Sequence, residues 1–584
     1  MIGFLRRRLT PPAANGGPPV FHLEGERDHI METGRSRLLV TAGLFLLVFC
    51  VIAGRMVEVT LTRGSYQRGH ANHATDALFR RADITDRNGV LLATSLPTVS
   101  LYAHPKEITD KAGTAERLHE VLPEIGEAEF ESKLKLERAF VYLRHNLTPR
   151  QEFDVNALGV PGLYFQQGEK RIYPQGDLTA HVVGLTDLDN KGVAGIERSF
   201  DRDLQARHEP LRLSLDIRVQ TILHNELAQA KTEFHAAGAT GMVMDVQTGE
   251  IVAMVSLPDF DPNNLGTPTP DAMFNKATLG VYEMGSTFKL FNTAAVLDYG
   301  VAGPEATFDA THPITIGRFT IHDYHPENRW LTMPEILLLS SNLGSARMGM
   351  LLGGERQKAF LERLGQTKPQ SLELPELGTP LVPAVWRDIN TMTIAYGHGM
   401  AVTPLHLVTG VSALVNGGIY HPATLLRRED GAEIPGRRVI KSQTSAELRP
   451  MMRFVVTGMN GEKGTGGNAE VAGYDVGGKT GTAEKNTGGA YKHNSLLSSF
   501  IAAFPISQPR YLVLAMIDEP QGIKESHGFA TGGWVAAPAA GRVIAQIGPL
   551  LGIPPRFNRD DDRVAQADVP STALSKEITF AEAQ

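Results

Sequence analysis

Two pairs of apolar runs that lie far apart in the sequence restrict the fold more than any other feature. In residues 240–256 (TGMVMDVQTGEIVAMVS) the runs flank a turn at residues 247–249, and in residues 499–520 (SFIAAFPISQPRYLVLAMIDEP) they flank a turn at residues 507–509. Apolar runs on either side of such a turn predict a β-hairpin. Because a long helix-rich region separates the hairpins, we expect one α+β domain whose sheet is completed by distant segments.

The 584-residue chain is too long for a single core, so two or three domains are expected. We predict a first domain over 59–211, where the pattern is mixed. Around Leu213 the pattern changes, and a second domain is predicted over 212–553, with Asp216 near the N-cap of its first helix. The acidic and polar residues 554–584 predict a flexible tail.

Two segments of the first domain allow local predictions. Residues 82–103 (ADITDRNGVLLATSLPTVSLYA) predict a strand, a turn at Asn88-Gly89 and a second strand. Residues 118–134 (LHEVLPEIGEAEFESKL) predict a helix.

An uncharged apolar run of 17 residues, Leu38–Gly54, lies near the start of the chain between Arg37 and Arg55. Its length is at the lower limit for a membrane-spanning helix, and the flanking arginines can reach the interfaces. We therefore predict a single-pass anchor over 37–58. A cleaved signal peptide is less favoured because no small-residue cleavage site follows, and a buried core helix is less favoured because the run is apolar all round.

The basic residues set the orientation of this predicted anchor. Residues 1–36 contain PPAANGGPP and charges, which predict a disordered tail. By the positive-inside rule this tail is cytoplasmic, and the residues after the anchor lie on the outer side of the inner (cytoplasmic) membrane. If the source is a bacterium with an inner and an outer membrane, these residues lie in the periplasm. The arginines that precede the run are Arg6, Arg7, Arg8, Arg27, Arg35 and Arg37.

Composition excludes some kinds of partner and site. The net charge of −7 gives no reason to expect nucleic acid. The single cysteine, Cys50, leaves no intrachain disulfide and no cysteine-based metal site. Phe49 precedes it, where a lipid-anchor signal has a small residue.

Three short motifs occur in a fixed order in the predicted second domain. They are Ser286-Thr287-Phe288-Lys289, Ser340-Ser341-Asn342 and Lys479-Thr480-Gly481-Thr482. Each is common by chance, but S-x-x-K, S-x-N and K-T-G together are typical of penicillin-binding proteins and class A β-lactamases.

The first motif fits a nucleophile and its base. If residues 286–298 form a helix, Ser286 and Lys289 lie on one face, with Ser286 at the N-terminus where the dipole favours a developing anion. A serine needs a base, and Lys289 can act as one only when neutral. We expect burial and a second cation, Lys479, to lower its pKa.

The other two motifs supply polar groups. Ser340 can relay a proton, and Asn342 can bind a substrate amide. Thr480 and Thr482 can bind a carboxylate. Gly481, in a predicted edge strand, lets the substrate backbone approach. The predicted oxyanion hole consists of the N–H groups of Ser286 and Thr482.

Two other patterns suggest other functions. Residues 473–480 match the phosphate-loop pattern G-x-x-x-x-G-K-[ST], but such a loop must open a helix, and the glycine-rich GTAEKNTGGAYKHN that follows is unlike one. The segment His322-Asp323-Tyr324-His325 could hold a metal, but lacks a third ligand at a recognisable spacing, so a hydrogen-bonded loop is favoured.

From residue 38 to about 550 the chain resembles class B penicillin-binding proteins. RADITDRNGVLLATS is similar to the family's segment after the anchor, and RIYPQGDLTAHVVGLTDLDNKGVAGIERSFD to the end of its non-catalytic, dimerisation-like pedestal. FNKATLGVYEMGSTFK, SSNLGSARM, AYGHGMAVTPLHL and GGKTGTAEK are similar to its transpeptidase segments. IGRFTIHDYHPENRWLTMPEI favours the division-specific type over the elongation type.

This resemblance implies a membrane anchor, an elongated pedestal and a transpeptidase domain with an antiparallel sheet covered by helices. It implies D,D-transpeptidation without a cofactor: Ser286 attacks the D-Ala–D-Ala bond of a peptidoglycan stem peptide, and β-lactams acylate the same serine. The implied partners are a polytopic septal glycosyltransferase and other division proteins. An elongation-type enzyme, a penicillin-binding scaffold or sensor without turnover, and a β-lactamase remain as alternatives.

Overall fold

The computed structural model divides the chain into two compact units, residues 1–79 and 80–584. The residues that it describes are 43, 46–53, 81–264, 266, 268–317, 319–487 and 490–557.

Little of the first unit is described. Residues 43 and 46–53 are helical and exposed. Among the described residues, no helix has both the length and the apolarity needed to cross a membrane. The predicted tail 1–36, most of the predicted anchor 37–58, and residues 558–584 of the predicted C-terminal tail lie outside the described residues.

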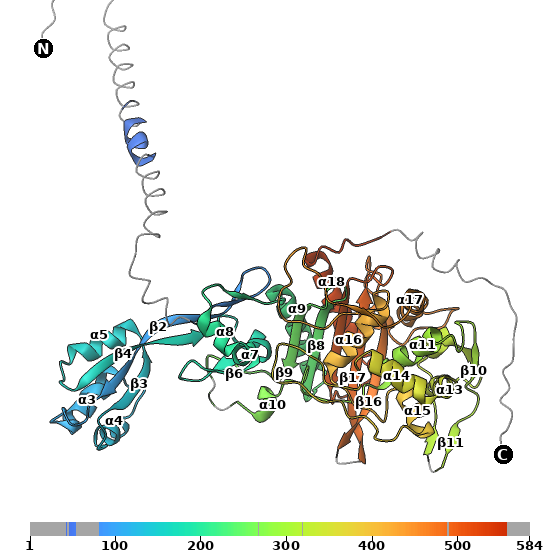
Figure 1. Ribbon diagram of the computed structural model, residues 1–584, viewed down its shortest axis with the longest axis horizontal. Helices are drawn as coiled ribbons and strands as arrows, with labels where there is room; N and C mark the ends of the chain where they lie inside the picture. The colour runs from blue at the N-terminus through green and yellow to red at the C-terminus, as the bar shows by residue number, and fades with distance from the viewer. Residues whose placement is uncertain are drawn as a thin grey trace, which may run out of the picture. The chain divides into compact units, whose positions relative to one another are not determined.

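The second unit begins with the predicted strand, turn and strand. β1 (Ile84–Thr85) and β2 (Leu91–Ala103) pair antiparallel, which confirms the hairpin. The Asp86 carboxylate accepts hydrogen bonds from the Asn88 and Val90 N–H groups and so holds the turn closed. β2 also pairs antiparallel with β3 (Val141–Leu147) and β4 (Leu163–Ile172) (Figure 1). β1 pairs parallel with β7 (Leu211–Arg212), so this five-stranded sheet is mixed.

The single helix predicted over 118–134 is wrong. The segment holds the end of α3 (Lys111–Val121) and all of α4 (Glu127–Leu134). Pro123 lacks a backbone N–H and disfavours a helical conformation at Leu122, which ends α3. With α5 (Pro149–Ala157), these helices pack their apolar side chains on β2 and β3.

An ion cluster that is buried except for the partly exposed Asp201 joins β4 to the segment before β1. Glu197, in α7 (Gly195–Ser199), receives Arg81 Nε and Arg171 Nε, each at 2.6 Å. Arg81 also contacts Asp201 at 2.7 Å. Each of the two arginines in this cluster therefore contacts at least one carboxylate directly.

A five-stranded antiparallel sheet forms the centre of the remaining chain, in the order β16-β17-β18-β8-β9. Its strands are β8 (Gly238–Asp245), β9 (Ile251–Leu257), β16 (Gly477–Thr487), β17 (Ala490–Phe504) and β18 (Tyr511–Asp518). Pairing of β8 with β18 confirms that distant segments complete the sheet.

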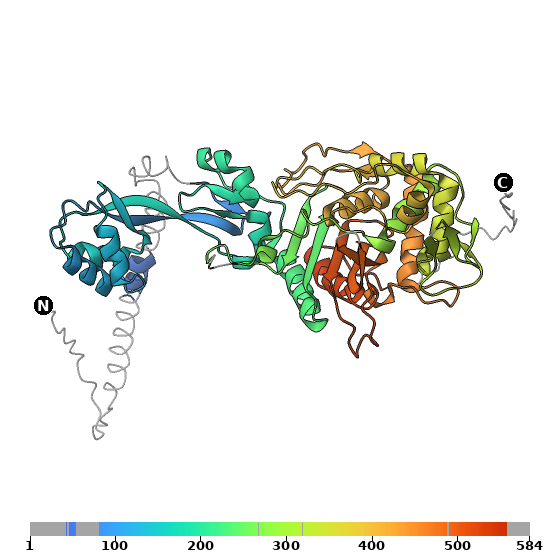
Figure 2. The same cartoon turned by 90° about the horizontal axis from the view of Figure 1, so that it is seen from below.

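Helices cover both faces of this sheet (Figures 1 and 2). Val243 and Val513 point to α9 (Ile217–Glu233) and α18 (Ala536–Leu550), whereas their strand neighbours Met242 and Leu514 belong to the core on the opposite face. That core contains α11 (Lys289–Asp298), α13 (Asn342–Leu352), α16 (Pro404–Val415) and α17 (Ser442–Thr457). As predicted, Asp216 caps α9, its side chain accepting from Arg218 N.

Shorter elements complete the described residues. They are η1 (Gly176–Thr179), α6 (Ala180–Val183), β5 (Leu185–Thr186), β6 (Gly192–Ala194), α8 (Asp201–Ala206), β7 (Leu211–Arg212), α10 (Pro270–Met273), η2 (Gly285–Phe288), β10 (Thr307–Asp309), β11 (Ile314–Ile316), β12 (Phe319–Ile321), β13 (Trp330–Thr332), α12 (Met333–Leu338), α14 (Gly354–Arg363), α15 (Asp388–Ala395), β14 (Ile419–Tyr420), β15 (Arg437–Arg438) and η3 (Gly467–Ala469).

Candidate active site

Ser286 lies in η2, a 3₁₀ helix of one turn that runs directly into α11. The sequence predicted one helix from Ser286 onward, and the structure differs only in its tighter first turn. Gly285 opens the turn at φ 55°, and its N–H donates to Gly397 O at 3.1 Å. A side chain at Gly285 would meet Thr482 O at 2.6 Å, so glycine permits this close approach to β16.

Lys289 brings the first two motifs together. Its side chain is fully buried. Its Nζ lies 2.7 Å from Ser286 Oγ and 2.8 Å from Asn342 Oδ1. It also lies 3.0 Å from Ser340 O. The amine is therefore within reach of the Ser286 hydroxyl proton, as a general base must be.

Ser340 links the two lysines. It lies between α12 and α13 at φ 60°, a left-handed conformation that is uncommon for a residue with a side chain. Its Oγ is 3.3 Å from Lys289 Nζ and 3.0 Å from Lys479 Nζ. Such strain is found where a site requires a particular geometry, and here it places one hydroxyl between two amines.

Burial lowers the pKa of both lysines. The pKa of Lys289 falls to about 7, and the charge of Asp323 opposes part of this shift. The pKa of Lys479 falls well below its usual value because of burial and, secondarily, the charge of Lys289. We expected burial and Lys479 to lower the pKa of Lys289, and burial is the main cause of the shift. The repulsion between the two amines disfavours charging both of them at once.

The third motif lies on β16, at one edge of the sheet, as predicted. Lys479 is fully buried, and Thr480 Oγ1 lies 3.1 Å from Thr465 Oγ1. A side chain at Gly481 would clash with Ser499 Oγ and lie 2.9 Å from the Thr287 methyl. Glycine at 481 is thus required by packing inside the protein, in addition to any approach of a substrate.

The two residues of the predicted oxyanion hole lie on adjacent segments. Ser286 follows Gly285, whose Cα faces the Thr482 carbonyl across the η2–β16 contact. The Thr482 hydroxyl accepts a hydrogen bond from Gly532 N at 3.1 Å. The backbones of η2 and β16 therefore approach each other closely next to Ser286 and Thr482, and the oxyanion hole stays a prediction.

Asp323 lies in the segment where a hydrogen-bonded loop was predicted, and the structure confirms those hydrogen bonds, but its role in the site was not predicted. Its carboxylate accepts from Ser341 Oγ at 2.7 Å and from Leu343 N at 2.9 Å, and also from Asn342 N. It thereby caps α13 and fixes the Ser-Ser-Asn motif. No local pattern could have revealed this, because the carboxylate comes from a loop distant in sequence.

Asn342 uses both amide atoms inside the protein. Its Oδ1 accepts from Lys289 Nζ at 2.8 Å, and its Nδ2 donates to His322 O at 3.0 Å. Through Oδ1 it contacts the Lys289 amine. Binding of a substrate amide by Asn342 stays a prediction.

The loop after α15 supports the nucleophile turn and was also missed. Glu283 accepts a hydrogen bond from Gly399 N at 2.8 Å. Between the glycines of this loop, His398 is half-buried, and its pKa falls to about 4 because of burial and the charge of Lys289. The His398 imidazole is therefore neutral near neutral pH.

Two other interpretations of the sequence, a phosphate loop and a metal site, can be compared with the structure. Residues 473–480 lead into strand β16 rather than a helix, so they do not form a phosphate loop. Asp323 is engaged in the hydrogen bonds above, and Tyr324 packs edge-on against His325. Over the described ranges, no group of three or more His, Cys, Asp or Glu residues could hold a metal ion.

Comparison with known proteins agrees with this geometry. Residues 239–545 match the penicillin binding protein transpeptidase domain, and residues 78–226 match the penicillin-binding protein dimerisation domain. The chain is 41% identical, over 92% of each chain, to the probable peptidoglycan D,D-transpeptidase FtsI of Caulobacter vibrioides. It is 28% identical to the peptidoglycan D,D-transpeptidase FtsI of Escherichia coli K12, over 89% of this chain and 92% of that one.

A solved structure has the same fold. Penicillin binding protein 3 from Mycobacterium tuberculosis, complexed with aztreonam, matches with a TM-score of 0.64 at 24% identity, over 82% of this chain and 97% of that one. Together with the two domain matches and the 41% identical relative, this likeness leads to one conclusion. The chain belongs to the penicillin-binding proteins that combine a dimerisation domain with a transpeptidase domain and act as peptidoglycan D,D-transpeptidases.

Proposed function

We propose that this chain cross-links peptidoglycan stem peptides at the division septum through an acyl-enzyme on Ser286. The observation that carries the proposal is the 2.7 Å contact between Ser286 Oγ and a fully buried Lys289 amine. Burial lowers the pKa of this amine to about 7, so a large share of it is neutral near neutral pH. A neutral amine at this distance can take the serine proton.

In the acylation step, Lys289 Nζ removes the proton as Ser286 Oγ forms a bond to the penultimate D-Ala carbonyl carbon. The N–H groups of Ser286 and Thr482 stabilise the oxyanion. The carbon–nitrogen bond then breaks, and the leaving D-Ala amine takes up a proton delivered through Ser340. Lys479, next to Ser340 Oγ, is placed to favour that transfer.

In the second step, an amine of a neighbouring stem peptide attacks the ester carbon. A new amide bond forms, the bond to Ser286 Oγ breaks, and the proton lost by the amine returns to the serine. Thr480 and Thr482, on the edge strand β16, bind the terminal carboxylate of the donor peptide. No cofactor is required for this exchange.

The same serine is the proposed target of β-lactams, in line with the aztreonam complex of the M. tuberculosis protein. Labelling of the full chain by a fluorescent penicillin tests the assignment. We expect wild type and the exposed control Ser132→Ala to label equally, and Ser286→Ala not to label. Labelling of Ser286→Ala at the wild-type rate would show that another residue is the nucleophile.

We also propose that the chain is anchored in the inner membrane by residues 37–58, with a cytoplasmic N-terminus and a periplasmic catalytic domain. The run Leu38–Gly54 has no charge, and Leu46, Phe49 and Val51 expose more than half of their surface. Such an anchor would bring the chain to a polytopic septal glycosyltransferase and other division proteins. Protease treatment of spheroplasts should remove the catalytic domain but leave residues 1–36 protected.

The elongation-type enzyme is the second candidate within the same chemistry. The segment IGRFTIHDYHPENRWLTMPEI and the names of the two relatives above favour the division type. Depletion of the chain in its own host should give filaments, whereas rounded cells would indicate the elongation type. A scaffold or sensor without turnover would label with penicillin but form no cross-links in vitro.

A further inference from the structure

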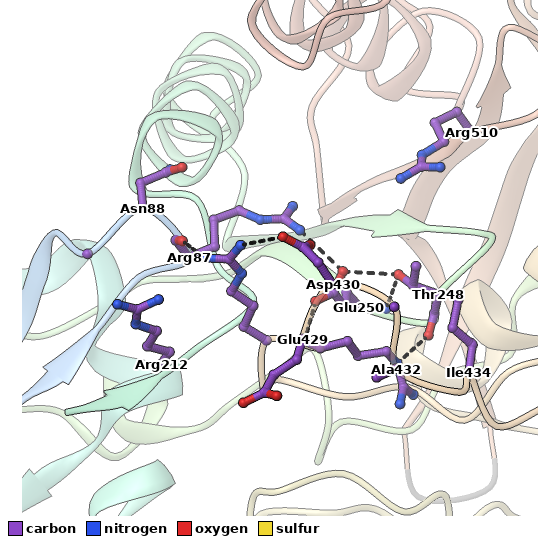
Figure 3. Close-up of a pocket in the computed structure, with 14 residues that line it drawn as sticks. Arg87, Asn88, Arg212, Thr248, Glu250, Glu429, Asp430, Ala432, Ile434 and Arg510 are labelled. Carbon is purple, nitrogen blue, oxygen red and sulfur yellow. Dashed lines mark hydrogen bonds and ion pairs between the residues drawn. The ribbon is translucent and has the colours of Figure 1, made fainter. Parts of the chain in front are cut away.

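A cavity of about 520 Å³ lies where the dimerisation and transpeptidase parts of the second unit meet (Figure 3). The first part contributes the turn after β1 and Arg212 of β7. The second contributes the turn between β8 and β9, the segment 427–434 and Arg510. The charged side chains of its lining are five arginines, Arg87, Arg212, Arg427, Arg428 and Arg510, and three acids, Glu250, Glu429 and Asp430.

This cavity is separate from the active site. Lys479 lies on β16, at one edge of the sheet, whereas Thr248 and Glu250 belong to the turn between β8 and β9 at the other edge. Adjacent strands are about 4.8 Å apart, so the three spacings from β16 to β8 correspond to roughly 15 Å. A ligand in the cavity would therefore not contact Ser286.

Some of the charge in the cavity is neutralised within the protein. The buried Glu250 carboxylate accepts from Arg87 Nη2 at 3.2 Å and from Arg428 N at 2.8 Å. Arg510 pairs with Asp245 at 2.7 Å. Arg87 and Arg510 thus each have a carboxylate partner.

The other three arginines lack a close carboxylate. Arg428 Nε donates to the Thr248 carbonyl at 2.9 Å, and a carbonyl does not neutralise charge. Arg427 lies 3.9 Å from Asp430, whose side chain is 98% exposed, so that pair is weak. The Arg212 side chain has no hydrogen bond or ion pair within the described part of the chain, and Figure 3 shows it apart from the bonded network.

Three guanidinium groups around one cavity repel one another unless an anion lies between them. Guanidinium donates forked hydrogen bonds to phosphate and carboxylate oxygens. A phosphate is favoured because its tetrahedral oxygens accept from several directions, whereas a carboxylate accepts in one plane. Glu429 and Asp430, which are exposed and also line the cavity, offset part of this charge, but the arginines of the lining outnumber its acids. The cavity volume of about 520 Å³ accommodates more than one phosphate.

We propose that this cavity binds a diphosphate group, free or as the head group of a lipid, and so links the two parts of the chain. The proposal does not depend on the acyl-transfer mechanism. Because the lining comes from both parts, bound diphosphate should stabilise the folded protein.

Titration of the detergent-solubilised full chain with inorganic pyrophosphate, followed by calorimetry and thermal unfolding, tests the site. We expect saturable binding and a raised Tm for wild type and for Arg138→Gln, which removes an exposed arginine outside the cavity. Arg212→Gln and Arg427→Gln should each bind about tenfold more weakly or worse. Penicillin acylation of each variant shows that it is folded.

Two further titrations identify the ligand class. Geranyl diphosphate in the same micelles tells a lipid head group from a free diphosphate. Tighter binding of geranyl diphosphate than of pyrophosphate indicates a lipid, and equal binding indicates a free diphosphate. Citrate, a polyvalent carboxylate, should bind more weakly than pyrophosphate. The proposal is overturned if wild type binds neither diphosphate, if the cavity variants bind as wild type does, or if citrate binds equally well.

Discussion

Two buried clusters of charged residues in this protein are built in opposite ways. In the dimerisation part, Glu197 lies between Arg81 and Arg171, with both ion pairs at 2.6 Å. In the transpeptidase part, Lys289 and Lys479 lie on either side of the Ser340 hydroxyl, and neither amine has a carboxylate within ion-pair distance among the described residues.

The first cluster stabilises the fold, whereas the second takes part in the chemistry of the active site. Buried charge persists where an opposite charge is in direct contact, and a buried amine without one tends to lose its proton. The first cluster therefore joins distant segments of the chain. The second holds an amine with a pKa of about 7 against a serine hydroxyl, as a general base requires.

Removing the amine of Lys289 should have the largest effect. In Lys289→Met the side chain keeps much of its apolar volume, but Ser286 loses its base. We expect the penicillin acylation rate to fall by about 10³-fold or more. Because no ion pair is broken, the free energy of unfolding should fall by only about 1 kcal/mol, from the lost hydrogen bonds to Ser340 and Asn342. Stopped-flow acylation and urea unfolding measure the two quantities, and acylation at the wild-type rate would contradict the role of Lys289.

Glu197→Gln should have the reverse pattern. The substitution leaves Arg171 and much of Arg81 buried without their carboxylate, so the free energy of unfolding should fall by about 3–5 kcal/mol. The acylation rate of the folded protein should not change. Glu129→Gln is a matched control, because the Glu129–Lys133 pair is exposed and should contribute little. Equal urea midpoints for the two variants would show that the buried pairs are unimportant.

Asp323→Asn should have a smaller effect on the active site. The amide cannot accept all the hydrogen bonds that the carboxylate accepts from Ser341, Asn342 and Leu343, so we expect the maximal acylation rate to fall about tenfold. The charge of Asp323 raises the pKa of Lys289, so its loss should move the pH–rate profile to lower pH. Asp309→Asn, in β10, is the control. An unmoved profile would mean that Asp323 acts only through packing.

Much of the fold was predictable because it follows local periodicity. Apolar runs around turns revealed both hairpins of the central sheet, and Asp216 marked the start of α9. The helix predicted over 118–134 was wrong because its apolar spacing continues across Pro123, where backbone hydrogen bonding cannot.

The candidate site was predictable only in part. The three motifs gave Ser286, Lys289 and Lys479, which the structure brings together. The role of Asp323 was missed because it caps α13 from a loop distant in sequence. The strained φ of Ser340 and the burial that lowers both lysine pKa values arise from tertiary packing, which no sequence spacing encodes.

The pH dependence of Ser286 acylation in the full chain tests the central claim most directly. If neutral Lys289 is the base, the rate of acylation by a fluorescent penicillin should rise with pH, with a midpoint near the Lys289 pKa of about 7, and then level off. One pH unit below the midpoint the rate should be about tenfold lower than the plateau. A rate that stays flat through this range would contradict the account.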